Sequence, residues 1–387
     1  MSNPKLALIP SGYKSGKVYS ILPNDATGDF DFDRASVGTR VRKDGLIEEV
    51  TDNVPRLDWY NSNCPSLLLE PERTNYATNN TSMDTYSNSV FGNNPNPTQT
   101  ADYTIAPDGT LTATRLQTSK TGTNYSLISF PTTSNDGSGG GYYTASVYVK
   151  SNTGSSQTIG FYGANSAPNN RTATTEWTRI QFTGQRLGNT KYAYLGAING
   201  TDDDIDISVW GAQIELVDSY PSSLIYTGAS TVTRLKDECL NGGDSDLFDI
   251  TEGTFFVDAT PFIPNSNNKI SLSDESSNNR IELQFRADAN GVDFLCEGQG
   301  NGLQVNRNES ITYNSRNKLL VTFDDSNFKI YVNGVLEFTD TSFTKPIDLD
   351  NLKYTAFNSI LNFEGKIHDT RVYDRVLTEA EAIELTT

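Results

Sequence analysis

Side chains that could contact a sugar occur in the middle of the chain. Aromatic rings stack on the C–H faces of sugar rings, and planar polar side chains form paired hydrogen bonds with hydroxyl groups. Four residues with these chemistries lie opposite the predicted core face of strand-like segments: Tyr148, Tyr162, Arg179 and Gln181. We expect them on neighbouring strands of one face, which is either a glycan-binding surface or an ordinary solvated or interface face.

Acidic side chains are concentrated in the stretch 201–206. Its four carboxylates belong to Asp202, Asp203, Asp204 and Asp206. Calcium takes six to eight oxygen ligands, and a loop of this kind supplies several of them. The stretch lacks EF-hand spacing, and its last Asp alternates with strand residues. It predicts either a structural calcium site or a solvated acidic turn, and the sequence requires no other cofactor.

Residues suited to catalysis are few. The chain has one histidine, His368, and three widely spaced cysteines, Cys64, Cys239 and Cys296. This odd number predicts no disulfide framework and no zinc site, so we expect small buried thiols. Glycoside hydrolysis requires two carboxylates that flank the scissile bond, and nothing singles out such a pair among 48 acidic residues. We therefore expect a structural His368 and a protein that is not an enzyme; a polysaccharide depolymerase is the alternative.

One basic cluster stands out in the sequence SVGTRVRK, at 36–43. Its cations are Arg40, Arg42 and Lys43. They either pair with acidic groups of the particle or of another subunit, or simply decorate a hairpin, and we favour the contact. Trp59 is expected at an interface or in a core. Trp177 and Trp210 are expected to pack in a core.

Alternating hydrophobicity predicts an all-β protein. In 143–150 one face holds Tyr143, Ala145, Val147 and Val149, and similar short segments follow, which is typical of an antiparallel sandwich or jelly roll. The last block alternates in the same way. There, Asn333-Gly334 predicts a hairpin turn, and Thr378 with Glu381 predicts a capping box that opens a short helix through Leu385.

The composition excludes several classes of function. The 387 residues include 30 Lys and Arg against 48 Asp and Glu, a net charge of −18 that repels phosphate backbones and anionic membranes. Aromatic residues make up 10% of the chain, which is more than a disordered chain carries. No apolar run is long enough for a membrane helix, and the first residues lack a secretory signal. We expect synthesis and folding in a cytoplasm, no nucleic-acid partner and no membrane insertion.

The C-terminal block resembles the laminin G-like, concanavalin A-like lectin/glucanase fold. The resemblance lies in KLLVTFDDSNFKIYVNGVLEF (318–338) and FEGKIHDTRVYDRVLTEAEAIEL (363–385). Members of this fold mostly bind sugars or proteins and less often cleave glycans. The glucanase branch carries an E-x-D-x-x-E strand motif, which this sequence lacks.

The remaining segments resemble bacteriophage tail, tail-fibre or head-fibre proteins. The matching segments are FDFDRASVGTRVRKDGLIEEVTDNVPRLDWYN (30–61), SLLLEPERTN (66–75) and WGAQIELVDSYPSSLIYTGASTVTRLKD (210–237). The block between them is similar to the carbohydrate-binding jelly rolls of such proteins. The order predicts three domains: an attachment or oligomerisation module (1–75), a carbohydrate-binding-module-like sandwich (76–237) and a concanavalin A-like sandwich (238–387).

This resemblance implies a surface protein of the virion. We expect a fibre or spike, a homotrimer that contacts other virion proteins and binds bacterial surface polysaccharide without catalysis. The alternative is a purely structural decoration of head or tail. The acidic, cysteine-poor composition fits a particle that is assembled inside a host cytoplasm.

Overall fold

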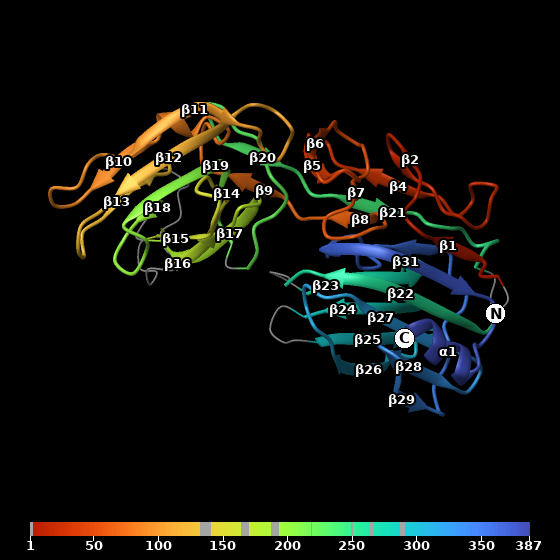
Figure 1. Cartoon of the computed structure of the whole chain (residues 1–387). Coiled ribbons are helices and arrows are strands. Elements are labelled where there is room, and N and C mark those ends of the chain that lie inside the picture. The colour runs from red at the N-terminus through yellow and green to blue at the C-terminus, as the bar shows by residue number, and fades with distance from the viewer. Residues whose placement is uncertain are drawn as a thin grey trace. The chain divides into compact units, whose positions relative to one another are not determined.

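The computed structural model describes residues 3–131, 141–163, 170–186, 193–217, 219–248, 251–263, 267–286 and 291–387 (Figure 1). Antiparallel sheets make up almost all of its regular structure, so the predicted all-β class with tandem sandwiches is confirmed. Over these ranges the helical elements are the 3-10 turn η1 (Met83–Thr85) and helix α1 (Glu379–Thr386). No described helix is long and apolar enough to cross a membrane.

The chain folds into two compact units. Unit 1 contains Met1–Lys43, Val50–Pro71 and Leu235–Thr387, and unit 2 contains Asp44–Glu49 and Glu72–Arg234. This division differs from the three consecutive domains expected from the sequence. The reason is that the two N-terminal segments of unit 1 contribute their apolar side chains to the core of the C-terminal sandwich.

Unit 1 is a sandwich of two sheets with smaller sheets around it. The larger sheet has the order β29 (Val335–Asp340), β28 (Phe328–Val332), β27 (Asn317–Phe323), β22 (Gly253–Pro261), β31 (Gly365–Tyr373), β8 (Ser66–Leu69) and β7 (Leu57–Asp58), and β1 (Leu6–Leu8) also pairs with β31. The other sheet has the order β26 (Leu303–Ser310), β25 (Gly291–Glu297), β24 (Arg280–Phe285), β23 (Asn268–Ser273) and β30 (Asn351–Lys353).

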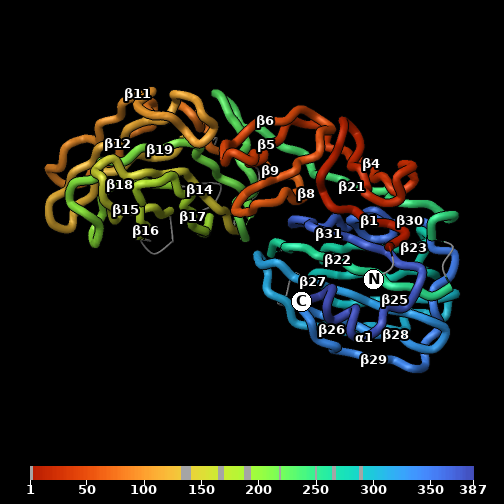
Figure 2. Tube along the Cα trace, turned by 45° about the vertical axis from the view of Figure 1, so that its right-hand side comes forward, coloured from red at the N-terminus to blue at the C-terminus, as the bar shows by residue number. Residues whose placement is uncertain are grey.

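Short pairings involve the remaining strands near the start of the chain. They are β2 (Tyr13–Lys14), β3 (Lys17–Val18), β4 (Phe30–Asp33) and β21 (Glu238–Leu240) in one sheet, and β5 (Gly38–Val41) with β6 (Ile47–Val50) in a hairpin. Figure 2 shows β1 and β8, from the start of the chain, beside β31, from its end. Leu6, Leu8 and Leu67 are fully buried there and belong to the same hydrophobic core as Phe255 and Val257 of β22.

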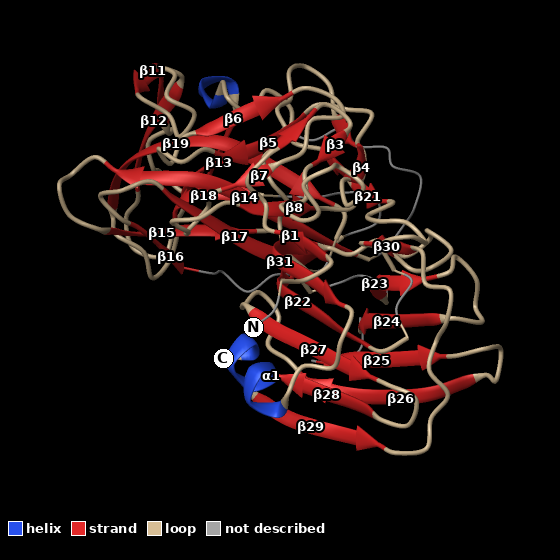
Figure 3. Ribbon diagram, turned by 90° about the vertical axis from the view of Figure 1, so that its right-hand side faces the viewer, coloured by secondary structure: helices blue, strands red, loops and turns tan. Residues whose placement is uncertain are grey.

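Two local signals in the C-terminal block are confirmed. Asn333 and Gly334 have φ of 47° and 85° and form the turn between β28 and β29. The Thr378 hydroxyl accepts a hydrogen bond from the Glu381 N–H at 3.3 Å, and the Glu381 carboxylate accepts one from the Thr378 N–H at 3.0 Å. Figure 3 shows α1 beside β27, β28 and β29, where it covers the outer apolar cluster around Phe256.

Unit 2 is a second sandwich. One sheet has the order β11 (Thr98–Thr104), β12 (Ala113–Ser119), β19 (Asp204–Glu215), β14 (Tyr142–Ser151) and β17 (Thr178–Gln185). The opposite sheet has the order β10 (Ser87–Val90), β13 (Ser126–Ser129), β18 (Tyr194–Ala197), β15 (Gln157–Tyr162) and β16 (Asn170–Ala173). A short pair joins β9 (Arg73–Asn75) to β20 (Val232–Arg234).

The alternation in β14 confirms the predicted core face of unit 2. Tyr143, Ala145, Val147 and Val149 are fully buried between the two sheets. Trp210 is also fully buried, as expected, but it lies on the outer face of β19 between Tyr148 and Tyr226, with ring centroids 5.8 and 5.9 Å away. Its indole N–H donates to the Thr112 hydroxyl at 3.1 Å. Trp177 is half-buried and donates to the Ile105 carbonyl at 3.0 Å.

Candidate functional site

The four predicted glycan-contact residues do not form one surface. Tyr148 of β14 and Arg179 of β17 are register partners, and Gln181 is the partner of Ser146 one step along the same face. Tyr162 lies on β15, in the opposite sheet, where it pairs with Tyr194. The prediction that all four share neighbouring strands is therefore wrong for Tyr162, because alternation assigns a face to a residue without assigning its strand to a sheet.

Tyr148 and Arg179 hold a segment of the chain against their sheet. The Arg179 guanidinium donates to the Ser222 carbonyl at 2.7 Å and to the Ser146 hydroxyl at 2.9 Å. It also lies 5.5 Å from the centroid of the Tyr148 ring. Ser222 is fully buried, and its N–H donates to the Glu215 carboxylate at 2.9 Å. The segment around Ser222, which follows β19, therefore covers this half of the outer face.

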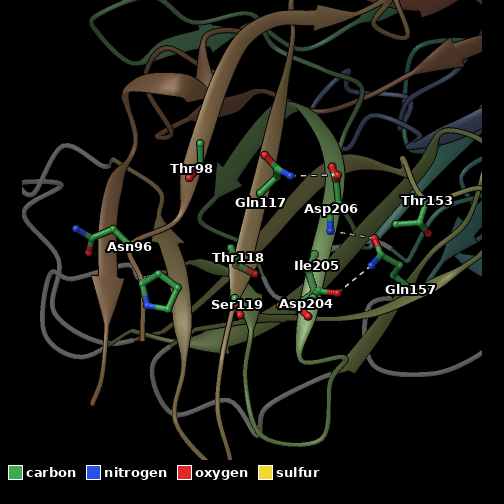
Figure 4. A pocket seen from close by; sticks show the side chains of 11 residues that line it. Asn96, Thr98, Gln117, Thr118, Ser119, Thr153, Gln157, Asp204, Ile205 and Asp206 are labelled. Atoms are coloured by element: carbon green, nitrogen blue, oxygen red, sulfur yellow. Dashed lines mark hydrogen bonds between the residues drawn. The ribbon is translucent and has the colours of Figure 1, made fainter. Parts of the chain in front are cut away.

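The other half of unit 2 contains a groove of about 460 Å³. It lies where β12 ends and β19 begins, close to the loop before β11 (Figure 4). Nine of its eleven lining residues are polar, and they carry hydroxyl, amide and carboxylate groups. The lining residues are Pro95, Asn96, Thr98, Gln117, Thr118, Ser119, Thr153, Gln157, Asp204, Ile205 and Asp206.

Asp206 is the centre of a hydrogen-bonded network of planar side chains at this groove. The Arg115 guanidinium donates to both of its carboxylate oxygens, with Nε to Oδ1 at 2.9 Å. Asn152 donates to Oδ1 at 3.0 Å, and Gln117 donates to Oδ2 at 3.3 Å. The backbone N–H of Asp206 donates to the Gln157 side chain at 3.1 Å, as Figure 4 shows. The network fixes these side chains in one arrangement before any ligand arrives.

Several polar groups of the groove remain open to a ligand. Within the described residues, the side chains of Asn96, Thr98 and Ser119 form no hydrogen bond with other protein groups. A hydroxyl-rich ligand or water would supply the partners that these groups lack.

The electrostatics of the network favour hydrogen-bond acceptance over proton transfer. The hydrogen bonds from Arg115, followed by those of Asn152 and Gln117, hold the pKa of Asp206 below its ordinary value against the effect of burial. The hydrogen bond to Asp206 in turn raises the pKa of Arg115. The Tyr103 ring, 42% exposed, lies 4.8 Å from the Arg115 guanidinium. A charged pair with an adjacent aromatic ring is therefore present beside the groove at neutral pH.

The acidic stretch does not converge on one point. Asp203 forms an ion pair with Lys120, and Asp206 is held by Arg115. Asp202 accepts a hydrogen bond from the Thr158 N–H at 3.0 Å, and Asp204 is exposed at the groove. In the described ranges, no three His, Cys, Asp or Glu side chains are grouped so that they could hold a metal ion. The arrangement agrees with the alternative of a solvated acidic turn.

The basic cluster lies in unit 1 and is engaged in local contacts. Arg40 donates to the Tyr13 hydroxyl at 2.9 Å, and Lys43 lies 5.4 Å from the centroid of the Trp59 ring. Trp59 is half-buried, and its backbone N–H donates to the Val41 carbonyl at 3.0 Å. Arg42 is exposed and also has an interaction partner. Contact of these residues with another subunit stays a prediction.

His368 is half-buried, and two of the cysteines are buried. The His368 Nε2 atom is 2.9 Å from the Thr260 hydroxyl, and burial lowers the pKa of His368 to about 4. The ring is therefore neutral at pH 7. Cys239 and Cys296 are buried, as expected, whereas Cys64 is exposed. The Cys64 position differs from the prediction because it lies in a turn between β7 and β8.

The sequence reasoning missed four residues near the groove: Tyr103, Arg115, Gln117 and Asn152. A signal for two of them exists in β12, where Arg115 and Gln117 alternate with buried Leu116 and so share one face. Tyr103 and Asn152 carry no such signal, because they reach the network only when β11 and the turn after β14 come together through long-range pairing.

Comparison with known proteins identifies part of unit 1. Residues 257–382 match the concanavalin A-like lectin/glucanases superfamily, which confirms the resemblance predicted for the C-terminal block. No curated protein matches the chain.

Weaker likenesses exist among solved structures. One is the CBM40 of the Ruminococcus gnavus IT-sialidase, with 18% identity, a TM-score of 0.31, and coverage of 36% of this chain and 84% of that one. Another is domain 4 of a GH43 extracellular arabinanase from Geobacillus stearothermophilus in complex with arabinotriose, with 15% identity, a TM-score of 0.33, and coverage of 41% and 77%. Because one fold serves many functions, the function is argued from the residues of this chain.

Proposed function

We propose that the protein binds carbohydrate through the Asp206 groove of unit 2, without catalysis, and does so on the surface of a bacteriophage virion. The observation that carries the binding site is the set of pre-arranged planar side chains around Asp206. Sugar hydroxyls both donate and accept hydrogen bonds, and a groove with amide, hydroxyl and carboxylate groups offers partners for both.

The ionised state of Asp206 supports the proposal that this groove binds carbohydrate without catalysis. A general acid in glycoside hydrolysis needs a raised pKa, so that it carries a proton at neutral pH. Arg115 lowers the pKa of Asp206, which therefore stays ionised. Asp206 is also occupied by three neighbouring side chains, so it is suited to hold the groove in shape and to accept hydrogen bonds.

The virion role is supported by the order of the segments in the sequence. The segments at 30–61, 66–75 and 210–237 resemble parts of phage fibre and spike proteins, and a concanavalin A-like match follows them at 257–382. A net charge of −18 keeps many copies apart on a crowded surface. We propose a homotrimer exposed on the particle, in which weak single sites on bacterial polysaccharide gain strength from several simultaneous contacts.

The experiment is a screen of the purified protein on an array of bacterial surface polysaccharides. Wild type is compared with Gln117→Ala, and Gln181→Ala serves as the matched control on the same sheet outside the groove. We expect specific binding by the wild type and the control and a weaker signal for Gln117→Ala. Release of reducing ends from a bound polysaccharide would instead establish a depolymerase. A folded protein that binds no polysaccharide but docks on the phage particle would establish a structural decoration.

A further inference from the structure

The opposite sheet of unit 2 carries a row of aromatic rings on its outer face. Phe91 follows β10, and its N–H donates to the Tyr125 carbonyl at 3.1 Å. The two rings are stacked, with centroids 5.5 Å apart and an interplanar angle of 21°. Tyr162 of β15 and Tyr194 of β18 form a second pair, 5.5 Å apart at 32°. We call these four rings the aromatic row.

The rings of the aromatic row share one face and lie near one another. Tyr162 follows the core residue Phe161, and Tyr194 precedes the core residue Leu195, so both tyrosines point away from the core. Burial raises the pKa of Tyr162 to about 12, and the nearby phenols of Tyr125 and Tyr194 contribute to this shift. At neutral pH the Tyr162 hydroxyl is therefore protonated, and it can donate a hydrogen bond beside its ring.

Apolar residues and glycines also lie on this sheet. Leu127, Gly196 and Gly160 are register partners across β13, β18 and β15. Ile128 faces the main core, so its neighbour Leu127 points to the outer face. Leu127 is nevertheless fully buried. Ile198 is 5% exposed and lies over Gly160, where an added Cβ would approach it to 2.6 Å. Packed rings lose little side-chain freedom when a ligand binds.

This face is almost free of charge. The strands read SNSV, SLIS, YLGA, QTIGFY and NRTA, and Arg171 is the one charged residue among them. Its guanidinium turns to the edge, where Nε and Nη2 donate to the Gln181 carbonyl at 3.0 and 2.8 Å. The groove differs, because Asp204 and Asp206 place charges at its walls.

We propose that Phe91, Tyr125, Tyr162 and Tyr194 form a second carbohydrate site, which binds neutral sugar rings by stacking. The inference rests on the proposed carbohydrate-binding function and adds a site with a different ligand preference. A nucleic acid would require cations that this face lacks. A second copy of the chain would require about 800 Å² from each partner. The four rings expose much less surface area than this, because Phe91 is 60% exposed and the three tyrosines are half-buried.

The test is a calorimetric titration of the full chain with neutral hexasaccharides of glucose, galactose and xylose, and with hexagalacturonate as the acidic counterpart. The variants are Phe91→Ala, Phe91→Tyr, the groove variant Gln117→Ala and the control Tyr142→Ala. Tyr142 is an exposed tyrosine of the other sheet. We expect Phe91→Ala to weaken binding of a neutral hexasaccharide about 3- to 10-fold, the effect of one lost stacking contact. Phe91→Tyr and Tyr142→Ala should leave that binding unchanged.

The remaining outcomes would overturn the aromatic row, the groove or both. Unchanged affinity of Phe91→Ala overturns the aromatic row, and so does complete loss of neutral-sugar binding in Gln117→Ala, which would leave the groove as the single site. If no neutral hexasaccharide binds the folded protein while a polysaccharide on the array does, the aromatic row is wrong and the groove stands. If neither binds, both proposals fail.

Discussion

Replacement of Asp237 by alanine is the perturbation that we expect to destabilise unit 1 most specifically. Asp237 lies just before β21, and its carboxylate is fully buried. It accepts hydrogen bonds from Arg34 at 3.2 Å, from Arg56, and from the Glu70 N–H at 2.8 Å. Asp237 therefore connects three points in the N-terminal part of unit 1 to the segment that enters the C-terminal sandwich.

The magnitude follows from what Asp237→Ala leaves behind. The side chains of Arg34 and Arg56 are both 0% exposed. Burial lowers the pKa of Arg56, but the charges of Asp237 and Glu70 outweigh this effect and raise it above its ordinary value. Removing one partner of a buried pair costs about 3–5 kcal/mol, because the remaining charge stays buried without compensation. Glu70 still neutralises one of the two arginines, so we expect a cost within this range and no more.

The assay is hydrogen exchange measured by mass spectrometry in increasing urea, which follows each unit separately. Peptides from β22 and β27 report on the core of unit 1, and peptides from β14 report on unit 2. The control is Asp31→Ala, which removes an exposed ion pair with Lys17 and should cost less than about 1 kcal/mol. If Asp237→Ala costs unit 1 no more unfolding free energy than this control does, the network does not hold the unit together as argued.

Three further predictions follow from single contacts. Gly242→Ala should cost unit 1 about 1–3 kcal/mol in urea unfolding, because the new Cβ would lie 2.3 Å from the ring of buried Phe30; Gly228→Ala, which meets nothing within 4 Å, is the control, and equal costs would refute the clash. Because burial lowers the folded pKa of His368 to about 4, against about 6.5 when unfolded, the unfolded chain binds more protons between these values, and stability should fall as pH drops through that window. The His368→Gln variant should lack this part of the pH dependence, and identical profiles would contradict the assignment. Addition of calcium or of a chelator should leave the melting temperature unchanged, because Lys120 and Arg115 already pair with Asp203 and Asp206; a calcium-dependent increase would restore the alternative of a structural calcium site.

The sequence predicted what local patterns encode. Strict alternation identified the buried face of β14, Asn333-Gly334 identified a turn with two positive φ angles, and Thr378 with Glu381 identified the helix start. Each of these depends on residues within a few positions of one another. The match at 257–382 shows that the C-terminal motifs carried correct information about the fold as well.

Long-range pairing could not be predicted in this way. Leu6 pairs with Val372 and Leu67 with Ile367, so strands from the start of the chain enter a sheet whose other members come from its end. Neither pairing has a local signal, and the N-terminal part of the chain therefore looked like a separate module. The same limit explains why Tyr162 was assigned to the wrong sheet.

Alternation along β19 turns Trp210 outward, because Ile207 and Val209 face the core, and a local irregularity follows it. The pairing of β14 with β19 shifts register between Ser146 and Tyr148, and Gly211 has a φ of 67° beside it. A β-bulge of this kind reverses the alternation beyond Trp210, so Ala212 and Ile214 face the core. Trp210 is then buried by Tyr148, Tyr226 and Thr112 on the outer face.

The most direct test of the central claim is a crystal structure of the protein with the polysaccharide fragment that gives the strongest array signal. The account predicts sugar density in the groove of unit 2, with hydroxyls within hydrogen-bond distance of Gln117 and of Asn96, Thr98 or Ser119, and with the Asp206–Arg115 pair intact. Density confined to the concanavalin A-like sandwich of unit 1, with an empty groove, would contradict it.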